Sequence, residues 1–137
     1  MQVSEVMHVG VRSVDVTETI RNVAKLMKEE DIGAVPVVQN ERAIGLVTDR
    51  DIVLDAVAEE EDLDEPISKL LIDSGIYSVT PSTTIEEASR IMKKNKISRL
   101  LVTEDYRPIG MLSVQDLALN TENDDLTGEV ISEIKEY

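Results

Sequence analysis

The sequence predicts a mixed α/β (α+β) fold in which one β-α-β-β-α unit of secondary structure occurs twice. The first observation is an internal repeat, because residues 10–54 align with residues 75–119 without a gap at an offset of 65. The second is a change of hydrophobic pattern within each copy, from a helical period to short β-branched runs. A chain of 137 residues with 42% apolar residues is long enough to bury a core in both copies.

Identical residues recur along the whole alignment. The pairs include Thr19 with Thr84, Ile20 with Ile85, Met27 with Met92, Gly45 with Gly110, and Asp51 with Asp116. One structural unit is therefore present twice. A short segment before each unit also recurs, as Val3–Met7 and Ile67–Leu71, at an offset that is one residue smaller.

Residues at helical spacing predict an amphipathic helix near the start of each repeat. They fall at i, i+3, i+4 and i+7, as Ile20, Val23, Ala24 and Met27 in the first copy and Ile85, Ala88, Ser89 and Met92 in the second. Thr17 precedes the first helix, and the hydroxyl residues 82–84 precede the second. Such residues cap helix N-termini, so these hydroxyls need no functional explanation.

Two short apolar runs follow each helix and predict a β-hairpin. The runs are residues 34–38 and 44–47 in the first copy, and residues 99–103 and 109–112 in the second. A polar turn separates the two runs in each case. A second helix is expected to begin near Thr48 or Ser113.

The joint between the repeats is acidic and short. Residues 58–66 contain six carboxylates and end at Pro66, which marks the boundary between a first domain, 1–66, and a second, 67–121. Residues 122–137 form an acidic tail, in which a short helix would place Val130, Ile131 and Ile134 on one face. That face is expected to pack on its own module or on a partner chain.

The composition excludes several classes of partner. A formal net charge of -14 repels nucleic-acid phosphates, so a general nucleic-acid binder is not expected. The acidity serves either solubility or the recruitment of a basic partner. No apolar run reaches the length of a membrane span, and the N-terminal residues lack the pattern of a signal peptide. We therefore predict a cytoplasmic protein with no membrane partner.

No catalytic constellation is evident. The chain has no cysteine and one histidine, His8, which lies outside the aligned repeat. Thiolate chemistry, cysteine-bound metals and a multi-histidine metal cage are therefore excluded. We expect no enzyme activity, no catalytic cofactor and no metal.

A hydroxyl and a carboxylate recur three residues apart where the hairpin leads into the second helix. The motif is Gly-h-h-[Ser/Thr]-x-x-Asp, with h an apolar residue, and it runs from Gly45 through Thr48 to Asp51 and from Gly110 through Ser113 to Asp116. One interpretation is a capping box that only closes the helix N-terminus. The other is ligand binding, with the hydroxyl beside a phosphate and the carboxylate on a ribose. The two interpretations are compatible.

These motifs, with the strands 32–37 and 97–102 before them, closely resemble the CBS domain, named after cystathionine beta-synthase. The resemblance covers residues 3–121. It implies two repeats related by a pseudo-twofold axis, with their small sheets packed together and an adenosine compound held in the cleft between them. The compound would be AMP, ADP, ATP or S-adenosylmethionine, acting as a regulatory ligand. The resemblance puts Asp51 and Asp116 on ribose, and Thr48 and Ser113 near phosphate.

Further site residues follow from positions in the family. Arg99 stands where CBS pairs commonly direct an arginine at ligand phosphates, while its repeat counterpart is Ala34, so the two clefts should differ. A salt bridge is the alternative for Arg99. The residues expected to line the base or expose backbone to the ligand are Val11, Arg12, Gly33, Ala34, Ile76, Tyr77 and Ser98. Leu101 replaces the proline that the first copy has at Pro36, so that strand is expected to differ in shape.

The resemblance also implies partners. Two chains would form a homodimer, a flat disc of four repeats, and an effector enzyme or transporter would respond to the bound ligand. The competing hypothesis is a structural dimerisation or scaffold module whose ligand clefts are vestigial. A ligand that binds only the native state must raise thermal stability, which separates the two hypotheses.

Overall fold

The computed structural model describes residues 1–71 and 76–120. The chain divides into two compact units. The first-repeat unit is Arg12–Ile76, and the second-repeat unit combines Met1–Val11 with the chain from Tyr77 onward. These units differ from the ranges 1–66 and 67–121, because short segments cross from one repeat to the other. The boundary at Pro66 stays a prediction about the repeats in the sequence.

The first-repeat unit follows the predicted order of elements. They are β2 (Val14–Asp15), α1 (Ile20–Glu30), β3 (Ala34–Gln39), β4 (Arg42–Thr48), α2 (Asp49–Ile52), the π-helical segment η2 (Val53–Val57) and the 3-10 turn η3 (Ile67–Leu70). The sheet order is β2-β3-β4, with β2 parallel to β3 and β3 antiparallel to β4. The predicted β-α-β-β-α unit is confirmed.

The second-repeat unit has the same core elements and one additional strand. They are the 3-10 turn η1 (Val3–Glu5), β1 (His8–Val9), β5 (Ser78–Val79), α3 (Ile85–Asn95), β6 (Arg99–Glu104), β7 (Arg107–Ser113) and α4 (Val114–Asn120). The sheet order is β1-β7-β6-β5. Strand β1 comes from the N-terminal segment and pairs antiparallel with β7.

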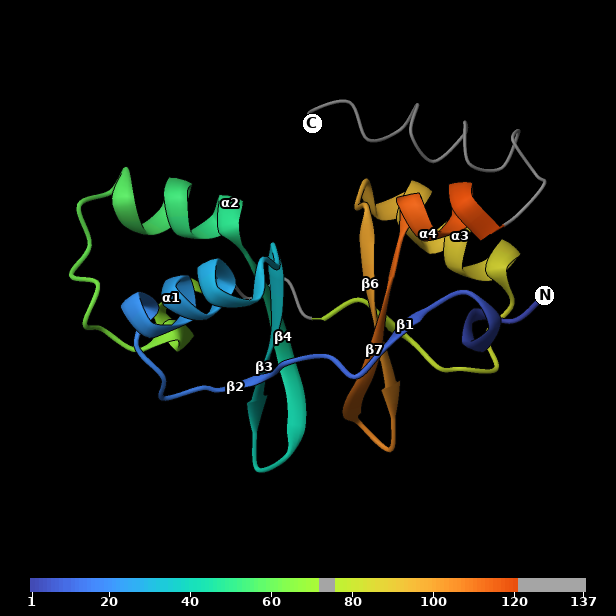
Figure 1. Ribbon diagram of the computed structural model, residues 1–137, viewed down its shortest axis with the longest axis horizontal. Coiled ribbons are helices and arrows are strands. Elements are labelled where there is room, and N and C mark those ends of the chain that lie inside the picture. The colour runs from blue at the N-terminus through green and yellow to red at the C-terminus, as the bar shows by residue number, and fades with distance from the viewer. Residues whose placement is uncertain (72–75, 121–137) are drawn as a thin grey trace. The chain divides into compact units, whose positions relative to one another are not determined.

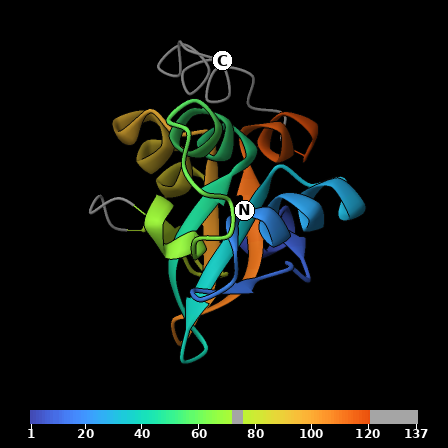
Figure 2. The same cartoon turned by 90° about the vertical axis from the view of Figure 1, so that its left-hand side faces the viewer.

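Within each unit, both α-helices lie on one face of the sheet. Helices α1 and α2 lie on one side of β3 and β4, and α3 and α4 lie on one side of β6 and β7 (Figure 1). Figure 2 views the first-repeat unit from its helical side. The two cores occupy equivalent positions in the repeats, as Ile20, Val23, Met27, Val35, Val37 and Val47 and as Ile85, Ala88, Met92, Leu100, Val102 and Leu112. The helical and strand periods of the sequence therefore identify the buried faces.

Threonine caps both long helices, but not always the threonine expected. The Thr19 Oγ1 accepts a hydrogen bond from the Asn22 N–H at 3.1 Å, and Thr84 caps α3 in the same way. The assignment of Thr17 as the first cap is wrong. Its hydroxyl and its N–H instead donate to the Asp15 carboxylate, and these hydrogen bonds lower the pKa of Asp15.

Two segments, which we call the crossing segments, each precede one repeat in the sequence and complete the hydrophobic core of the other repeat. They are residues 1–7, which contain η1, and residues 65–71, which contain η3. Val3 and Ile67 are fully buried in the second-repeat and first-repeat cores, respectively.

Matching backbone hydrogen bonds hold both crossing segments. The Val3 N–H donates to the Thr83 carbonyl at 2.8 Å, and the Ile67 N–H donates to the Glu18 carbonyl at 2.6 Å. In return, the N–H groups of Ile85 and Ile20 donate to residues 1 and 65 at 3.1 and 3.0 Å. Each segment thus holds in place the loop that precedes the long helix of its unit, α1 or α3. The recurrence of these segments in the sequence reflects this shared structural task.

Proline in one copy changes the strand pairing, as expected. Leu101 pairs with Ser78, and its N–H donates to the Tyr77 carbonyl at 3.3 Å. Pro36 has no N–H to donate, and the pairing of β2 with β3 begins one position later, at Val14 with Val37. Both Pro36 and Leu101 are buried. The two-residue parallel ladder of the first-repeat unit is therefore displaced by one position from that of the second-repeat unit.

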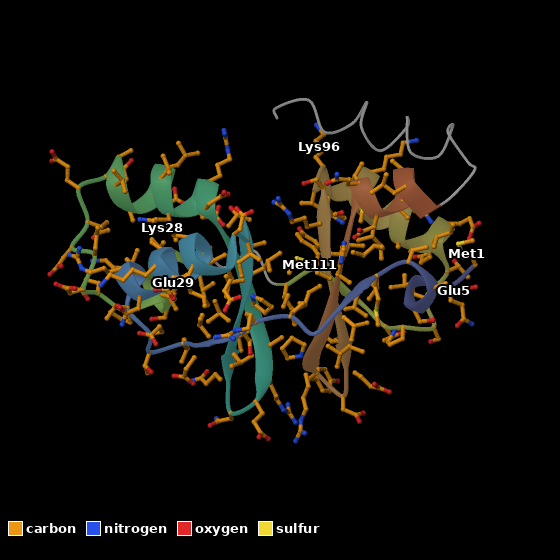
Figure 3. All side chains as sticks on the ribbon, viewed as in Figure 1. Met1, Glu5, Lys28, Glu29, Lys96 and Met111 are labelled. Atoms are coloured by element: carbon orange, nitrogen blue, oxygen red, sulfur yellow. The ribbon has the colours of Figure 1, made fainter. Side chains whose placement is uncertain are left out.

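The two long helices end at non-glycine residues in the left-handed conformation. Asp31 follows α1 with φ of 54°, and Lys96 follows α3 with φ of 55°. Figure 3 labels Lys96 at the end of its helix. A side chain with a Cβ is disfavoured in this conformation, and aspartate tolerates it better than lysine.

Lys96→Gly is therefore expected to stabilise the protein by about 0.5–1 kcal/mol, because glycine adopts the left-handed cap without steric cost. The matched control is Lys94→Gly, the same substitution at an exposed position inside α3, which should destabilise by a similar amount. Urea unfolding at equilibrium measures both changes. A loss of stability in Lys96→Gly would contradict the cap geometry.

Candidate functional site

The hydroxyl and carboxylate of each repeated motif contact each other where the hairpin enters the second helix. In the first-repeat unit, the Thr48 N–H donates to Asp51 Oδ2 at 2.8 Å, and the Asp51 N–H donates to Thr48 Oγ1 at 3.1 Å. In the second-repeat unit, Ser113 and Asp116 make the same two bonds at 2.8 and 3.1 Å. Both motifs are capping boxes, as one interpretation of the sequence expects. Each cap uses the Oδ2 atom of its carboxylate, and the ligand-binding role of these residues stays a prediction.

The two carboxylates differ in burial and in their partners. Asp116 is buried, with 4% of its surface exposed, while Asp51 is partly exposed. The His8 Nε2 lies 2.8 Å from Asp116 Oδ1. Within residues 1–71 and 76–120, Asp51 forms no ion pair. The repeated motif therefore presents two electrostatically different carboxylates.

The contact between His8 and Asp116 was missed at the level of sequence. His8 lies outside the aligned repeat, and nothing in the alignment places it beside the repeated motif. Strand β1 brings it back, because His8 pairs with Met111 on β7, two residues before Ser113. A two-residue strand has no detectable period, so the only signal was the recurrence of the segment just before it.

The glycine of each motif packs against the end of a crossing segment or the residue directly after it. A Cβ on Gly110 would come within 2.5 Å of the His8 carbonyl oxygen. A Cβ on Gly45 would come within 2.6 Å of a methyl carbon of Leu71. Both glycines are therefore explained by close packing, and a direct role in ligand binding is not needed to account for them.

Other predicted residues lie beside the capping boxes in the strand register. Ala34 pairs with Thr48, and Arg99 pairs with Ser113. Backbone bonds fix the residues just before these strands, because the carbonyl of Gly33 accepts from the Asp49 N–H at 3.0 Å. The carbonyl of Ser98 accepts from the Val114 N–H at 2.9 Å.

Each unit therefore gathers four predicted site residues at one end of its hairpin. They are Gly33, Ala34, Thr48 and Asp51 in the first-repeat unit, and Ser98, Arg99, Ser113 and Asp116 in the second-repeat unit. The half-buried Arg99 makes no ion pair with any residue that the structure describes, so the salt-bridge alternative gains no support there. One cluster carries a cation at the position where the other carries Ala34.

Four of the residues predicted to line the base lie where the chain passes from one unit to the other, namely Val11, Arg12, Ile76 and Tyr77. Val11 ends the N-terminal part of the second-repeat unit, and Arg12 begins the first-repeat unit. The Arg12 Nη1 lies 3.3 Å from Glu30 Oε1. Ile76 is partly buried, and Tyr77 is 40% exposed. Their predicted role in lining a base stays a prediction.

The described residues contain neither a metal-binding cluster nor a membrane-spanning helix. Among them, no group of three or more His, Asp or Glu side chains is arranged to hold a metal ion. No helix in residues 1–71 and 76–120 has the length and apolar character needed to span a bilayer.

Comparison with known proteins identifies relatives along nearly the whole chain. The sequence profile of the CBS domain matches residues 3–58 and again residues 66–120. The chain is 32% identical over 132 residues to the CBS domain-containing protein YhcV of Bacillus subtilis, covering 96% of this chain and 94% of that protein.

Solved structures share the fold. The CBS domain protein PAE2072 of Pyrobaculum aerophilum, complexed with AMP, is similar with a TM-score of 0.79 at 24% identity, covering 96% of this chain and 99% of that one. The CBS domain pair of protein MJ0100, in complex with 5′-methylthioadenosine and S-adenosyl-L-methionine, is similar with a TM-score of 0.77 at 20% identity. That comparison covers 87% of this chain and 94% of the other.

The motif glycines should differ in their tolerance of a methyl group. Gly110→Ala meets a backbone carbonyl, which cannot move without disturbing β1, and should destabilise by about 1–3 kcal/mol. Gly45→Ala meets the end of a leucine side chain, which can change rotamer, and should cost less than about 1 kcal/mol. Urea unfolding of the two variants gives the comparison. Equal losses would show that the crossing segments are not held as described.

Proposed function

Because the chain belongs to the CBS domain family, we propose that it is a non-catalytic regulatory module that binds an adenosine-containing ligand and signals to a partner protein. The observation that carries this proposal is the paired hydroxyl and carboxylate at the hairpin-to-helix turn of both repeats. In each pair the cap occupies Oδ2, and Oδ1 is not used by the cap. A carboxylate oxygen is the acceptor that ribose hydroxyls require.

The residues around each carboxylate fit the parts of a nucleotide. Asp51 and Asp116 would accept the ribose hydroxyls, and Thr48 and Ser113 would lie near phosphate. Arg99 adds a positive charge next to Ser113, and an arginine is well suited to phosphate oxygens. Its counterpart Ala34 suits an uncharged group. We therefore propose that the second-repeat cluster prefers an anionic ligand.

The choice of ligand class rests on two similar proteins. One was solved with AMP, and the other with 5′-methylthioadenosine and S-adenosyl-L-methionine. We include ADP and ATP, since an extended phosphate chain would also suit the cation. The backbone and base contacts proposed for the ligand come from Val11, Arg12, Gly33, Ala34, Ile76, Tyr77 and Ser98. The packing of the two small sheets around the ligand and the cytoplasmic location also stay predictions.

A structural scaffold with vestigial clefts is the second candidate function. It is favoured by one observation, because the capping bonds alone give Thr48 and Asp51 a structural purpose. Under this hypothesis no adenosine compound would alter the stability of the folded protein.

The proposed function predicts that at least one of AMP, ADP, ATP and S-adenosylmethionine binds. A ligand that binds only the native state raises the melting temperature by mass action, so thermal unfolding with each compound is the first measurement. Isothermal titration then gives the dissociation constant. Unchanged melting with all four compounds at millimolar concentration would leave the scaffold function as the better explanation.

Two threonine caps in the first-repeat unit separate capping from binding. Thr48→Ala and Thr19→Ala each remove a hydroxyl that accepts a backbone N–H at a helix start, so each should destabilise by about 1 kcal/mol. Only Thr48 belongs to the proposed site. A ligand that occupies the first-repeat cluster should therefore bind more weakly to Thr48→Ala and unchanged to Thr19→Ala. Equal affinities for the two variants would contradict phosphate binding by Thr48.

Apolar side chains on the second helix of the first repeat support the proposed homodimer. Val53, Leu54 and Val57 are exposed, at 55%, 45% and 57% of their surface, on the helical turn that follows α2. Exposed apolar residues that cluster on one element are typical of protein interfaces. We propose that these residues pack against a second copy, in a disc of four repeats that presents its ligands to an effector enzyme or transporter.

Val57→Asp is expected to weaken this association, because it places a charge in an apolar interface. Sedimentation equilibrium should show a dimer for the wild type and a shift of at least tenfold in the dissociation constant for the variant. The control is Val9→Asp, which adds the same charge at an exposed position on β1. An unaltered mass for Val57→Asp would exclude this helix from the interface.

A further inference from the structure

We propose that His8 competes with the ligand for Asp116 and so makes the second-repeat site the weaker of the two ribose sites. This inference rests on the proposed function, in which Asp116 accepts ribose hydroxyls. It assigns to the single histidine of the chain a regulatory role at a site formed far away in the sequence.

The geometry defines which atoms compete. The carboxylate of Asp116 only accepts hydrogen bonds, so the His8 Nε2 at 2.8 Å from Oδ1 carries the proton that it donates. The Ser113 N–H already donates to Oδ2. A ribose hydroxyl that binds Oδ1, the oxygen that the cap does not use, must share this atom with His8 or displace it.

The exposed fractions of the two side chains show which one a ligand can displace. The Asp116 side chain is 5% exposed, whereas the His8 side chain is 79% exposed. The carboxylate is held by its cap within the helix start, and the imidazole is free to rotate into solvent. Displacement by a ligand therefore moves His8 and leaves Asp116 in place.

The backbone of His8 stays fixed while its side chain turns. His8 and Val9 pair with β7, and the Gly10 N–H donates to the Ile109 carbonyl at 3.3 Å. The fully buried Val3 anchors the preceding turn. Strand β1, which directly follows the crossing segment, thus presents the imidazole to Asp116 at a constant position.

The first repeat has no equivalent competitor in its sequence. The offset that aligns the two crossing segments places Ile72 opposite His8, and an isoleucine side chain donates no hydrogen bond. Among the residues that the structure describes, no basic group pairs with Asp51. Of the described residues, none would have to be displaced from Asp51 in the way that His8 would be from Asp116, so the two sites should fill unequally.

The size of the effect follows from the exposure of the pair. A contact to a carboxylate from a donor that lies largely in water contributes little, so removal of His8 should tighten ligand binding at the Asp116 site by about two- to fivefold. Isothermal titration of His8→Ala with AMP, ATP and S-adenosylmethionine measures this change. His8→Gln keeps a side-chain donor and should stay near the wild-type affinity. Val9→Ala, which alters the exposed neighbour of His8, should also stay at the wild-type value.

A second readout follows His8 directly. Because the chain has one histidine, its imidazole gives a single set of NMR signals. In ligand-free Asp116→Ala, these signals mark an imidazole that has lost its partner. Saturating ligand should move the wild-type signals toward the same positions, and a purely structural role for His8 would not produce that movement.

The outcomes separate this inference from the proposed function. If a compound binds the wild type, but His8→Ala binds it equally or more weakly and the imidazole signals stay in place, competition by His8 is overturned and ligand binding stands. If no compound binds the wild type or His8→Ala, both the proposed function and this inference fail. Binding that appears only in His8→Ala would support competition in its strongest form.

Discussion

The rest of the structure depends on the burial of a short crossing segment in each repeat. Val3 and Ile67 lie fully inside cores made mostly by residues that come later or earlier in the chain. Burial of one such side chain contributes about 1.5–3 kcal/mol, which is a substantial part of the stability of a small unit. The backbone bonds of these segments also satisfy the loops before α1 and α3. A repeat without its crossing segment would therefore expose apolar core and leave buried polar groups unpaired.

Several features of the motif follow from this arrangement. The crossing segment needs space above β4 or β7, and glycine at residues 45 and 110 supplies it. In the second-repeat unit the same segment continues as β1 and carries His8 to Asp116. A packing requirement and a candidate regulatory contact thus have one structural origin. The capping box is independent of the segment, since it forms in both units with the same distances.

The sequence predicted the elements whose pattern is long enough to be periodic. Ile20, Val23 and Met27 define a helical face, and the runs after 34 and 99 define hairpins, because several residues report on the same period. Strand β1 was not predicted, since no period can be detected over two residues, and the crossing segments were recognised only as a recurrence without an assigned structural role. Thr17 was mistaken for a cap because the nearby Thr19 fits the same pattern, and only backbone geometry decides between them. The pairing of His8 with Asp116 depends on the tertiary fold and left no local signal.

A repeated motif with one structural task can carry two different binding tasks. The cap needs only one oxygen of each carboxylate, so the stability of the helix start does not depend on what the other oxygen binds. Neighbouring positions then set the chemistry of each copy. Arg99 and His8 bring donors to the second-repeat cluster, one suited to phosphate and one placed on the proposed ribose acceptor. A phosphate-bearing ligand would gain a favourable contact with Arg99, which offsets the free energy needed to displace His8. An uncharged nucleoside would have to displace His8 without that gain. The second-repeat site should therefore discriminate between these ligands more sharply than the first-repeat site.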